Sequence, residues 1–276
     1  MEAQGRFEMK FAVPLLLRDE LIRRSAQYMI PDKQAHRLDT QLRLKNAWGY
    51  AVHSLYFDST DLMDYFERLQ ENKIRNRLRI RTYGSPGQTS PVFLENKRKL
   101  ENRVVKQRVR ICDTEEWKQS PGEFPWSPWV ERLRGNSVYA GKHFDWLIRS
   151  GRRKPVSLVH YLREVYVPRE PRAGRLRFTL DHQVSITENP DSQDLHAAPT
   201  MLLIPQDWMV MELKYDRYPA QWMLQMCRDL RLLSEPISKF GMSVARSLRS
   251  HKTHEVRYLT PRSLRPILSE GYAAAT

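Results

Sequence analysis

The fold of this chain is decided by the stretch RNRLRIR, which occupies residues 75–81. Side chains in an extended strand point alternately to two faces, with a period of two residues. The stretch therefore predicts a strand with four arginines on one face and Leu78 and Ile80 on the other. The apolar face is expected to be buried. What has to be explained is whether the arginine face meets solvent or binds a ligand.

The same alternation of charged and apolar residues recurs along the chain. It is present in five further stretches, at residues 7–11, 93–99, 106–111, 175–181 and 210–214. One such strand is ordinary, because one face meets the core and the other meets water. Six of them predict either a sandwich with solvated outer faces or a closed barrel whose charged faces point inward. The pattern alone leaves both architectures open.

Helical segments are available to cover the apolar outer faces of a barrel. We expect helices at residues 15–29, after Pro14, and over the aromatic-rich residues 126–148. Two more are expected after Ser59 and after Pro219, each with apolar residues at helical spacing. Asp113 is expected to cap a short turn. We assign residues 6–246 to one domain and residues 247–276 to a tail that is expected to be partly disordered.

Composition limits the possible partners. The 276 residues include 46 Lys and Arg against 32 Asp and Glu, a net charge of +14, which favours a polyanionic partner such as nucleic acid, an anionic membrane surface or polyphosphate. Cys112 and Cys227 form no disulfide or zinc pattern. We find no secretory segment and no apolar stretch of membrane-spanning length, so we expect a reduced, cytoplasmic location.

Several motifs for phosphate or metal chemistry are absent from the sequence. There is no phosphate-binding loop of the G-x-x-x-x-G-K-[ST] type, no G-x-G-x-x-G fingerprint and no H-E-x-x-H helix. Any phosphate chemistry is therefore expected to use side-chain cations and a carboxylate-bound metal ion.

An ordered set of short motifs resembles a known family. The motifs are EMKF at residues 8–11, SLYFD at 54–58, RLRIRTYG at 77–84, LENK at 94–97, YLR at 161–163, RLRFTLD at 175–181, MELK at 211–214 and SKF at 238–240. The set, which spans about residues 6–246, is similar to the VTC catalytic domain. That domain is the polyphosphate polymerase of the vacuolar transporter chaperone complex and its stand-alone prokaryotic relatives, within the triphosphate tunnel metalloenzymes.

The resemblance implies a fold and an activity. The implied fold is α+β, an antiparallel eight-stranded tunnel β-barrel with a basic lumen and helices on its outer faces. The implied reaction transfers the γ-phosphate of ATP to a growing polyphosphate chain with Mn²⁺ or Mg²⁺ and releases ADP. The implied partners are ATP and polyphosphate, with an integral membrane partner for product export at the inner face of a membrane and no nucleic acid; the oligomeric state is left open.

The resemblance also implies roles for individual residues. It places at the phosphates a set of cations: Lys10, Arg79, Arg81, Lys97, Arg163, Arg177 and Lys239. It places Tyr161 near the nucleotide, Ser238 beside the late lysine, and Glu212 at the metal. The family has a further lysine where Pro236 stands in this chain, so one phosphate contact is missing or comes from elsewhere.

The strand pattern adds candidates of its own. Arg77, Lys106 and Arg108 share a parity with neighbouring cations and are candidates for substrate binding, while Glu95 and Glu8 are further metal candidates. On spacing alone these cations are equally compatible with a solvated basic face, and Glu212 with a salt-bridge partner for a basic neighbour.

Two other functions stay open at this point. A tunnel triphosphatase would keep the fold and hydrolyse its substrate, but its E-x-E-x-K start is incomplete here, where residues 7–10 read FEMK. A non-catalytic module that binds polyphosphate or RNA would fit the net charge. Single-strand binding, however, favours exposed aromatic residues among the basic ones, and the aromatic residues here mostly have helical spacing.

Overall fold

Twelve antiparallel strands form one sheet in the computed structural model, which describes residues 7–100, 103–120, 126–170, 174–248 and 261–264. Eight of these strands have six or more residues and pair in sequence around the sheet. In pairing order they are β1 (Phe7–Pro14), β12 (Trp208–Tyr215), β10 (Arg177–Glu188), β9 (Lys154–Pro168), β4 (Trp48–Asp58), β6 (Leu78–Tyr83), β7 (Pro91–Leu100) and β8 (Arg103–Asp113).

Four short strands extend this sheet at its margins. They are β2 (Met29–Pro31), β3 (His36–Arg37), β5 (Ile74–Arg75) and β11 (Met201–Leu202). They pair with β9, β4, β7 and β10, respectively. The expected antiparallel α+β fold is therefore confirmed, but the sheet has twelve strands in the described residues rather than eight.

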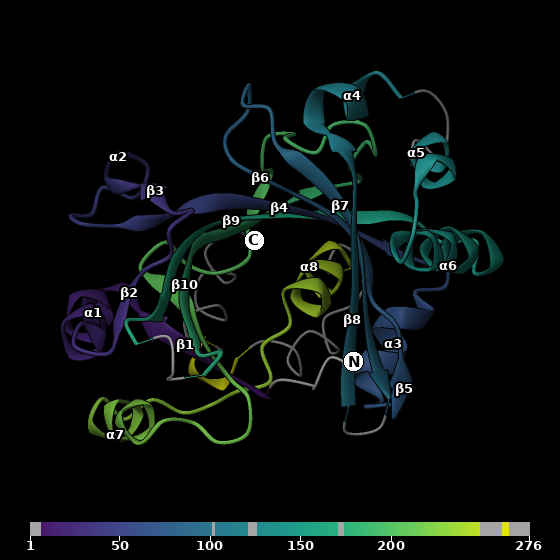
Figure 1. Cartoon of the computed structure of the whole chain (residues 1–276). Helices are drawn as coiled ribbons and strands as arrows, with labels where there is room; N and C mark the ends of the chain where they lie inside the picture. Colours follow the sequence, from purple (N-terminus) through teal and green to yellow (C-terminus); the bar gives the residue numbers. More distant parts are fainter. Residues whose placement is uncertain (1–6, 101–102, 121–125, 171–173, 249–260, 265–276) are drawn as a thin grey trace, which may run out of the picture.

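The sheet curves strongly but does not close, as Figure 1 shows. Within the described residues, β1 and β8 form no ladder with each other, so the expectation of a closed barrel is wrong for this structure. The segment before helix α8 (Lys239–Ser247) runs along the β1 edge, where the amide of Glu235 donates to the carbonyl of Lys10 at 2.8 Å. Across the opening, Lys97 Nζ lies 3.3 Å from Glu8 Oε2.

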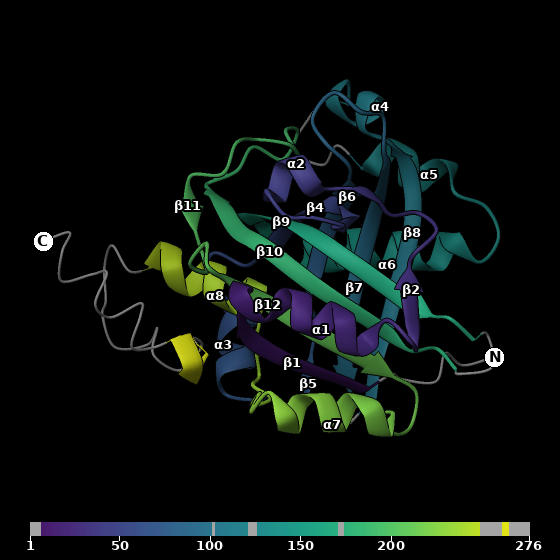
Figure 2. The ribbon, with the colours of Figure 1, turned by 90° about the vertical axis from the view of Figure 1, so that its left-hand side faces the viewer.

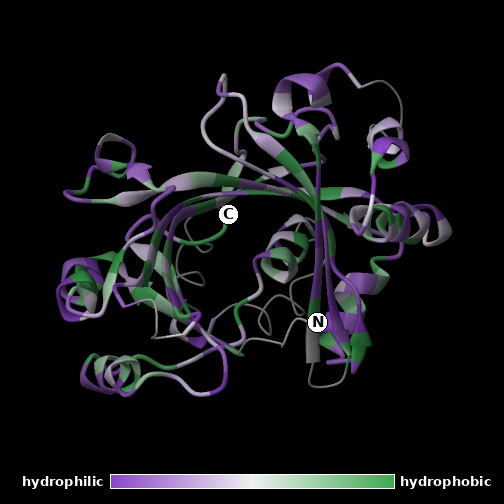
Figure 3. Cartoon of the chain, viewed as in Figure 1, coloured by the Kyte–Doolittle hydropathy of each residue, from purple (hydrophilic) through white to green (hydrophobic). Residues whose placement is uncertain are grey.

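Helices cover the outer face of the sheet, as expected. α1 (Arg18–Ser25) and α7 (Gln221–Asp229) pack against β1, β12 and β10 through a buried cluster that includes Leu21, Met211 and Met223. α4 (Thr114–Lys118), α5 (Ser127–Arg132) and α6 (Ser137–Ser150) cover the other half. The hydropathy colouring in Figure 3 shows long hydrophilic stretches on β7 and β8.

The helix boundaries refine the expectations from sequence. The segment 15–29 starts with the 3₁₀ turn η1 (Leu15–Leu17) before α1, and the segment 126–148 divides into α5 and α6. Asp113 caps α4 as expected, accepting from the amides of Glu115 and Glu116. The remaining helices are α2 (Asp39–Leu42), α3 (Met63–Leu69), α8 (Lys239–Ser247) and η5 (Arg262–Leu264), and no described helix is long and apolar enough to span a bilayer.

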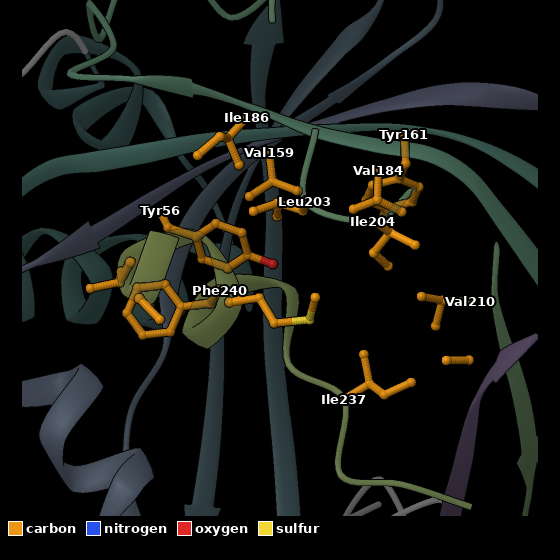
Figure 4. Close-up of a cluster of buried hydrophobic side chains, with 14 of the residues drawn as sticks. Tyr56, Val159, Tyr161, Val184, Ile186, Leu203, Ile204, Val210, Ile237 and Phe240 are labelled. Atoms are coloured by element: carbon orange, nitrogen blue, oxygen red, sulfur yellow. The ribbon is translucent and has the colours of Figure 1, made fainter. Parts of the chain in front are cut away.

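Helix α8 lies on the concave side of the sheet, which the sequence did not predict. Its Phe240 packs against the ring of Tyr56 and belongs to the buried cluster drawn in Figure 4, which also contains Val159 and Val210. In Figure 2, α8 and β11 lie toward the same end of the curved sheet. Leu264 of η5, which is fully buried, joins this cluster. The concave side therefore has an apolar region beside its charged one.

Candidate active site

The charged strand faces gather on the concave side, as the inward-facing alternative predicted. Ten cations and four carboxylates come from seven strands, the residue before β6, and α8. The cations are Lys10, Arg77, Arg79, Arg81, Lys97, Lys106, Arg108, Arg163, Lys214 and Lys239, and the carboxylates are Glu8, Glu95, Asp181 and Glu212. Within the described residues, ten positive charges face four negative ones, so an excess of six positive charges remains for an anionic ligand.

Glu212 lies at the centre of the first cluster. Its Oε2 is 2.7 Å from Lys214 Nζ and 3.1 Å from Arg163 Nη2. Its Oε1 is 3.1 Å from Lys239 Nζ and 3.8 Å from Lys10 Nζ. Lys10 stands directly opposite Glu212 on β1, so the strand register itself creates this contact.

Asp181 completes the Glu212 cluster. Arg163 donates to both of its oxygens at 2.6 and 2.7 Å, and Lys239 Nζ lies 2.5 Å from Oδ2. Asp181 and Arg163 are opposite each other on β10 and β9. Asp181 was not among the candidate residues, although it shares the strand parity of Arg177, which was the available signal.

Glu95 lies at the centre of the second cluster. Its Oε2 is 2.6 Å from Arg79 Nη2 and 3.9 Å from Arg81 Nε, and its Oε1 is 2.7 Å from Lys106 Nζ and 3.4 Å from Arg108 Nε. Arg79, Glu95 and Arg108 stand in register across β6, β7 and β8. A single carboxylate thus holds four cations in place.

Two buried tyrosines contact the clusters, and Tyr161 links one cluster to the other. The Tyr161 hydroxyl accepts from Arg81 at 3.1 Å, and Lys239 and Arg163 lie over its ring at 4.9 and 5.1 Å from the centroid. Tyr56 accepts from Arg79 at 3.0 Å. Because cations occupy the Tyr161 ring, this side chain orients charged groups in the structure rather than offering an open ring face to a base.

The electrostatic environment keeps the central carboxylates ionised. Burial raises the pKa of Glu212, but Lys214, Lys239 and Arg163 outweigh it and hold that pKa well below its usual range. Burial of Glu95 is likewise outweighed by Arg79 and other cations, so its pKa is also well below the usual range. Both carboxylates are negative at neutral pH.

Two lysines have the opposite perturbation. Desolvation, only partly offset by Glu8, and repulsion from Lys10 lower the pKa of Lys97 to about 8. Desolvation, partly offset by Glu95, lowers the pKa of Lys106 to about 8. A bound phosphate would favour the charged form of both lysines.

Two candidates lie apart from the two clusters. Arg177 donates to the Tyr50 hydroxyl at 3.0 Å and to Asp32 at 3.4 Å. Ser238 caps α8, accepting from the amide of Gly241 at 3.2 Å, so it positions the adjoining Lys239. All the other candidate residues belong to the clusters or adjoin them.

The residues fit a divalent metal that arrives with its substrate. Among the described residues, no group of three His, Cys, Asp or Glu side chains could hold a metal ion. Mg²⁺ and Mn²⁺ commonly use one or two carboxylates together with substrate phosphates and water. Glu212 supplies such a carboxylate. Lys10 and Lys239, which contact its Oε1, could pair with phosphate oxygens when a metal ion takes their place at this carboxylate.

Comparisons with known proteins give one family match. A family model described as the VTC domain matches residues 5–248, in agreement with the span of residues 6–246 expected from the motifs. No curated protein matches. A solved structure named as a "putative adenylate cyclase" from Vibrio parahaemolyticus is similar at 11% identity with a TM-score of 0.39, covering 87% of this chain and 98% of the other.

Proposed function

This chain belongs to the VTC domain family, and from that premise we propose that it is a metal-dependent polyphosphate polymerase that uses ATP. The observation that carries the proposal is the excess of six cations on the concave side of the sheet. A linear polyanion would neutralise that excess along several strands at once.

The proposed reaction requires positioning and charge neutralisation rather than a covalent intermediate with the protein. A terminal phosphate oxygen of the acceptor chain attacks the γ-phosphorus of ATP. The bond from that phosphorus to the β,γ-bridging oxygen breaks, and ADP leaves. Arg79 and Arg81 are suited to the equatorial oxygens, because a guanidinium can bind two phosphate oxygens in one plane.

Glu212 is proposed to be the protein ligand of the metal ion that accompanies the ATP triphosphate. Mn²⁺ or Mg²⁺ would neutralise charge that develops on the phosphates during transfer. Arg163 and Lys239 hold the Glu212 carboxylate in place, and Asp181 holds both of these cations. The lysines around Glu212 would then keep the triphosphate extended against the wall formed by β1 and β12.

The experiment is an assay of purified protein with ATP and Mn²⁺ that follows ADP release and polymer on a gel. We expect polymer from the native chain and none from Glu212→Gln, because the variant loses the buried carboxylate. Glu131→Gln on the exposed face of α5 is the matched control and should be fully active. Orthophosphate without polymer would identify a triphosphatase instead, and tight polyphosphate binding without turnover would identify a binding module.

A further inference from the structure

Arg77 differs from the other arginines of its strand run. It immediately precedes β6, and the amide of Lys97 donates to its carbonyl at 3.0 Å. Its guanidinium lies 5.3 Å from the centroid of the Phe240 ring on α8. The side chain therefore points to the concave side, toward the helix inside the sheet, while its backbone borders Lys97.

Arg77 lacks a counter-ion in the part of the chain that the structure describes. No carboxylate oxygen there lies within 4.0 Å of its guanidinium, whereas Arg79, two residues on, is 2.6 Å from Glu95. The Nε atom of Arg77 is buried and has no hydrogen-bond partner among those residues. A desolvated cation of this kind is unfavourable unless an anion pairs with it.

The surroundings of Arg77 show the same shortage of negative charge. Burial, partly offset by Tyr56, and repulsion from Arg68 and Arg79 lower the pKa of Arg77 to about 10. Lys97 next to it has one carboxylate partner, Glu8, which Lys10 and Lys214 also contact within 4.0 Å. Among the described residues, Arg77 and Lys97 therefore have one carboxylate near them, Glu8, and that carboxylate is also paired with Lys10 and Lys214.

We propose that Arg77 and Lys97 form a phosphate subsite that holds the acceptor end of an inorganic polyphosphate chain. The inference rests on the proposed function and names the place of its second substrate. An arginine fork can grip two phosphate oxygens while a lysine adds a point charge, and neither needs a metal ion. A nucleotide base has no place there, because the guanidinium covers the Phe240 ring and Tyr56 packs against that ring.

Arg77 differs in its chemistry from the cations of the two carboxylate clusters. Around Glu212 and Glu95, an incoming phosphate must compete with a carboxylate that already holds the cations. At Arg77 the first anion to arrive has no such competitor. Phosphate binding there should therefore occur without Mn²⁺ or Mg²⁺ and without ATP.

Calorimetric titration with inorganic tripolyphosphate in the presence of EDTA tests this subsite. Arg77→Met keeps an apolar stem over Phe240 and removes the charge, and we expect tripolyphosphate to bind about tenfold more weakly or worse. The matched control is Arg75→Met, two residues earlier. Among the residues that the structure describes, the Arg75 guanidinium donates only to the backbone carbonyl of Asn72, at 3.0 Å. Equal losses in the two variants would overturn the proposal.

Thermal unfolding separates a subsite from a packing role. Removing an uncompensated cation should raise the unfolding midpoint of Arg77→Met in phosphate-free buffer, and tripolyphosphate should then stabilise this variant less than it stabilises the native chain. A lower midpoint with unchanged tripolyphosphate affinity would show that Arg77 only packs on Phe240. Arg77→Lys, which keeps the charge, should retain part of the affinity.

The binding result and the polymerase assay can fail independently. If the native chain makes no polymer but Arg77→Met still loses tripolyphosphate affinity, the subsite stands and the polymerase proposal falls. If polymer forms, Arg77→Met should need more tripolyphosphate primer for half-maximal rate while the KM for ATP stays unchanged. A rise in the KM for ATP alone would instead place Arg77 at the donor.

Discussion

The Glu212 cluster and the Glu95 cluster look alike at their centres and differ at their edges. Each has one carboxylate, 5% and 1% exposed, contacted by four cations. Around Glu212, the side chains of Lys239 and Arg163 are 7% and 10% exposed. Around Glu95, those of Lys106 and Arg108 are 43% and 36% exposed.

The difference follows from a second carboxylate. Asp181 shares both Arg163 and Lys239 with Glu212, so these buried cations are compensated. Glu95 faces its four cations alone, and two of them reach solvent. The Glu212 cluster is therefore the more buried and more balanced half of the site, and the Glu95 cluster is the half with more cationic charge available to a ligand.

The largest effect should come from breaking the balanced half. Glu212→Gln would leave Lys239 and Arg163 buried beside one carboxylate, and removing one member of a buried charged network costs about 3–5 kcal/mol. Urea unfolding should show a loss of that size, with Glu131→Gln unchanged. A stability equal to that of the native chain would mean that the cluster is not coupled as the distances indicate.

A smaller effect is expected when one lysine is replaced in each cluster and the two variants are compared. Lys239→Met should destabilise the fold by about 3 kcal/mol because Asp181 loses a buried partner. Lys106→Met should change stability by less than about 1 kcal/mol, since its ion pair is partly solvated, yet weaken tripolyphosphate binding. If Lys106→Met destabilised the chain more than Lys239→Met, the Glu95 cluster and not the Glu212 cluster would contribute more to stability.

The smallest effect concerns pH. Lys97 and Lys106 have pKa values lowered to about 8, so both are charged below that pH and lose charge above it. Tripolyphosphate affinity should therefore fall as pH rises from 7 to 9. The double variant Lys97→Arg and Lys106→Arg stays charged and corrects for the ionisation of the ligand itself. Parallel pH profiles for the two proteins would contradict the assignment.

Much of the site was predictable because strand parity is a local property. The alternation in residues 77–81 and 211–214 correctly separated inward charges from outward apolar residues. The single strand predicted over residues 75–81 is instead divided between β5, which ends at Arg75, and β6, which starts at Leu78. The partners were not predictable. Arg163 meets Asp181 and Glu212 because β9, β10 and β12 pair in a particular register, and that register depends on contacts between distant segments.

The sequence by itself predicted six charged-and-apolar strands, the covering helices and the cations that face one way. Only the tertiary structure decided that α8 enters the concave side. It also decided that, across the described residues, the sheet stays open between β1 and β8 and Arg77 faces Phe240 without a carboxylate partner. The physical reason is the difference in sequence separation between the interactions that decide each feature. Side-chain alternation is set within a few residues, whereas compensation of a buried charge depends on which distant strand or helix arrives beside it.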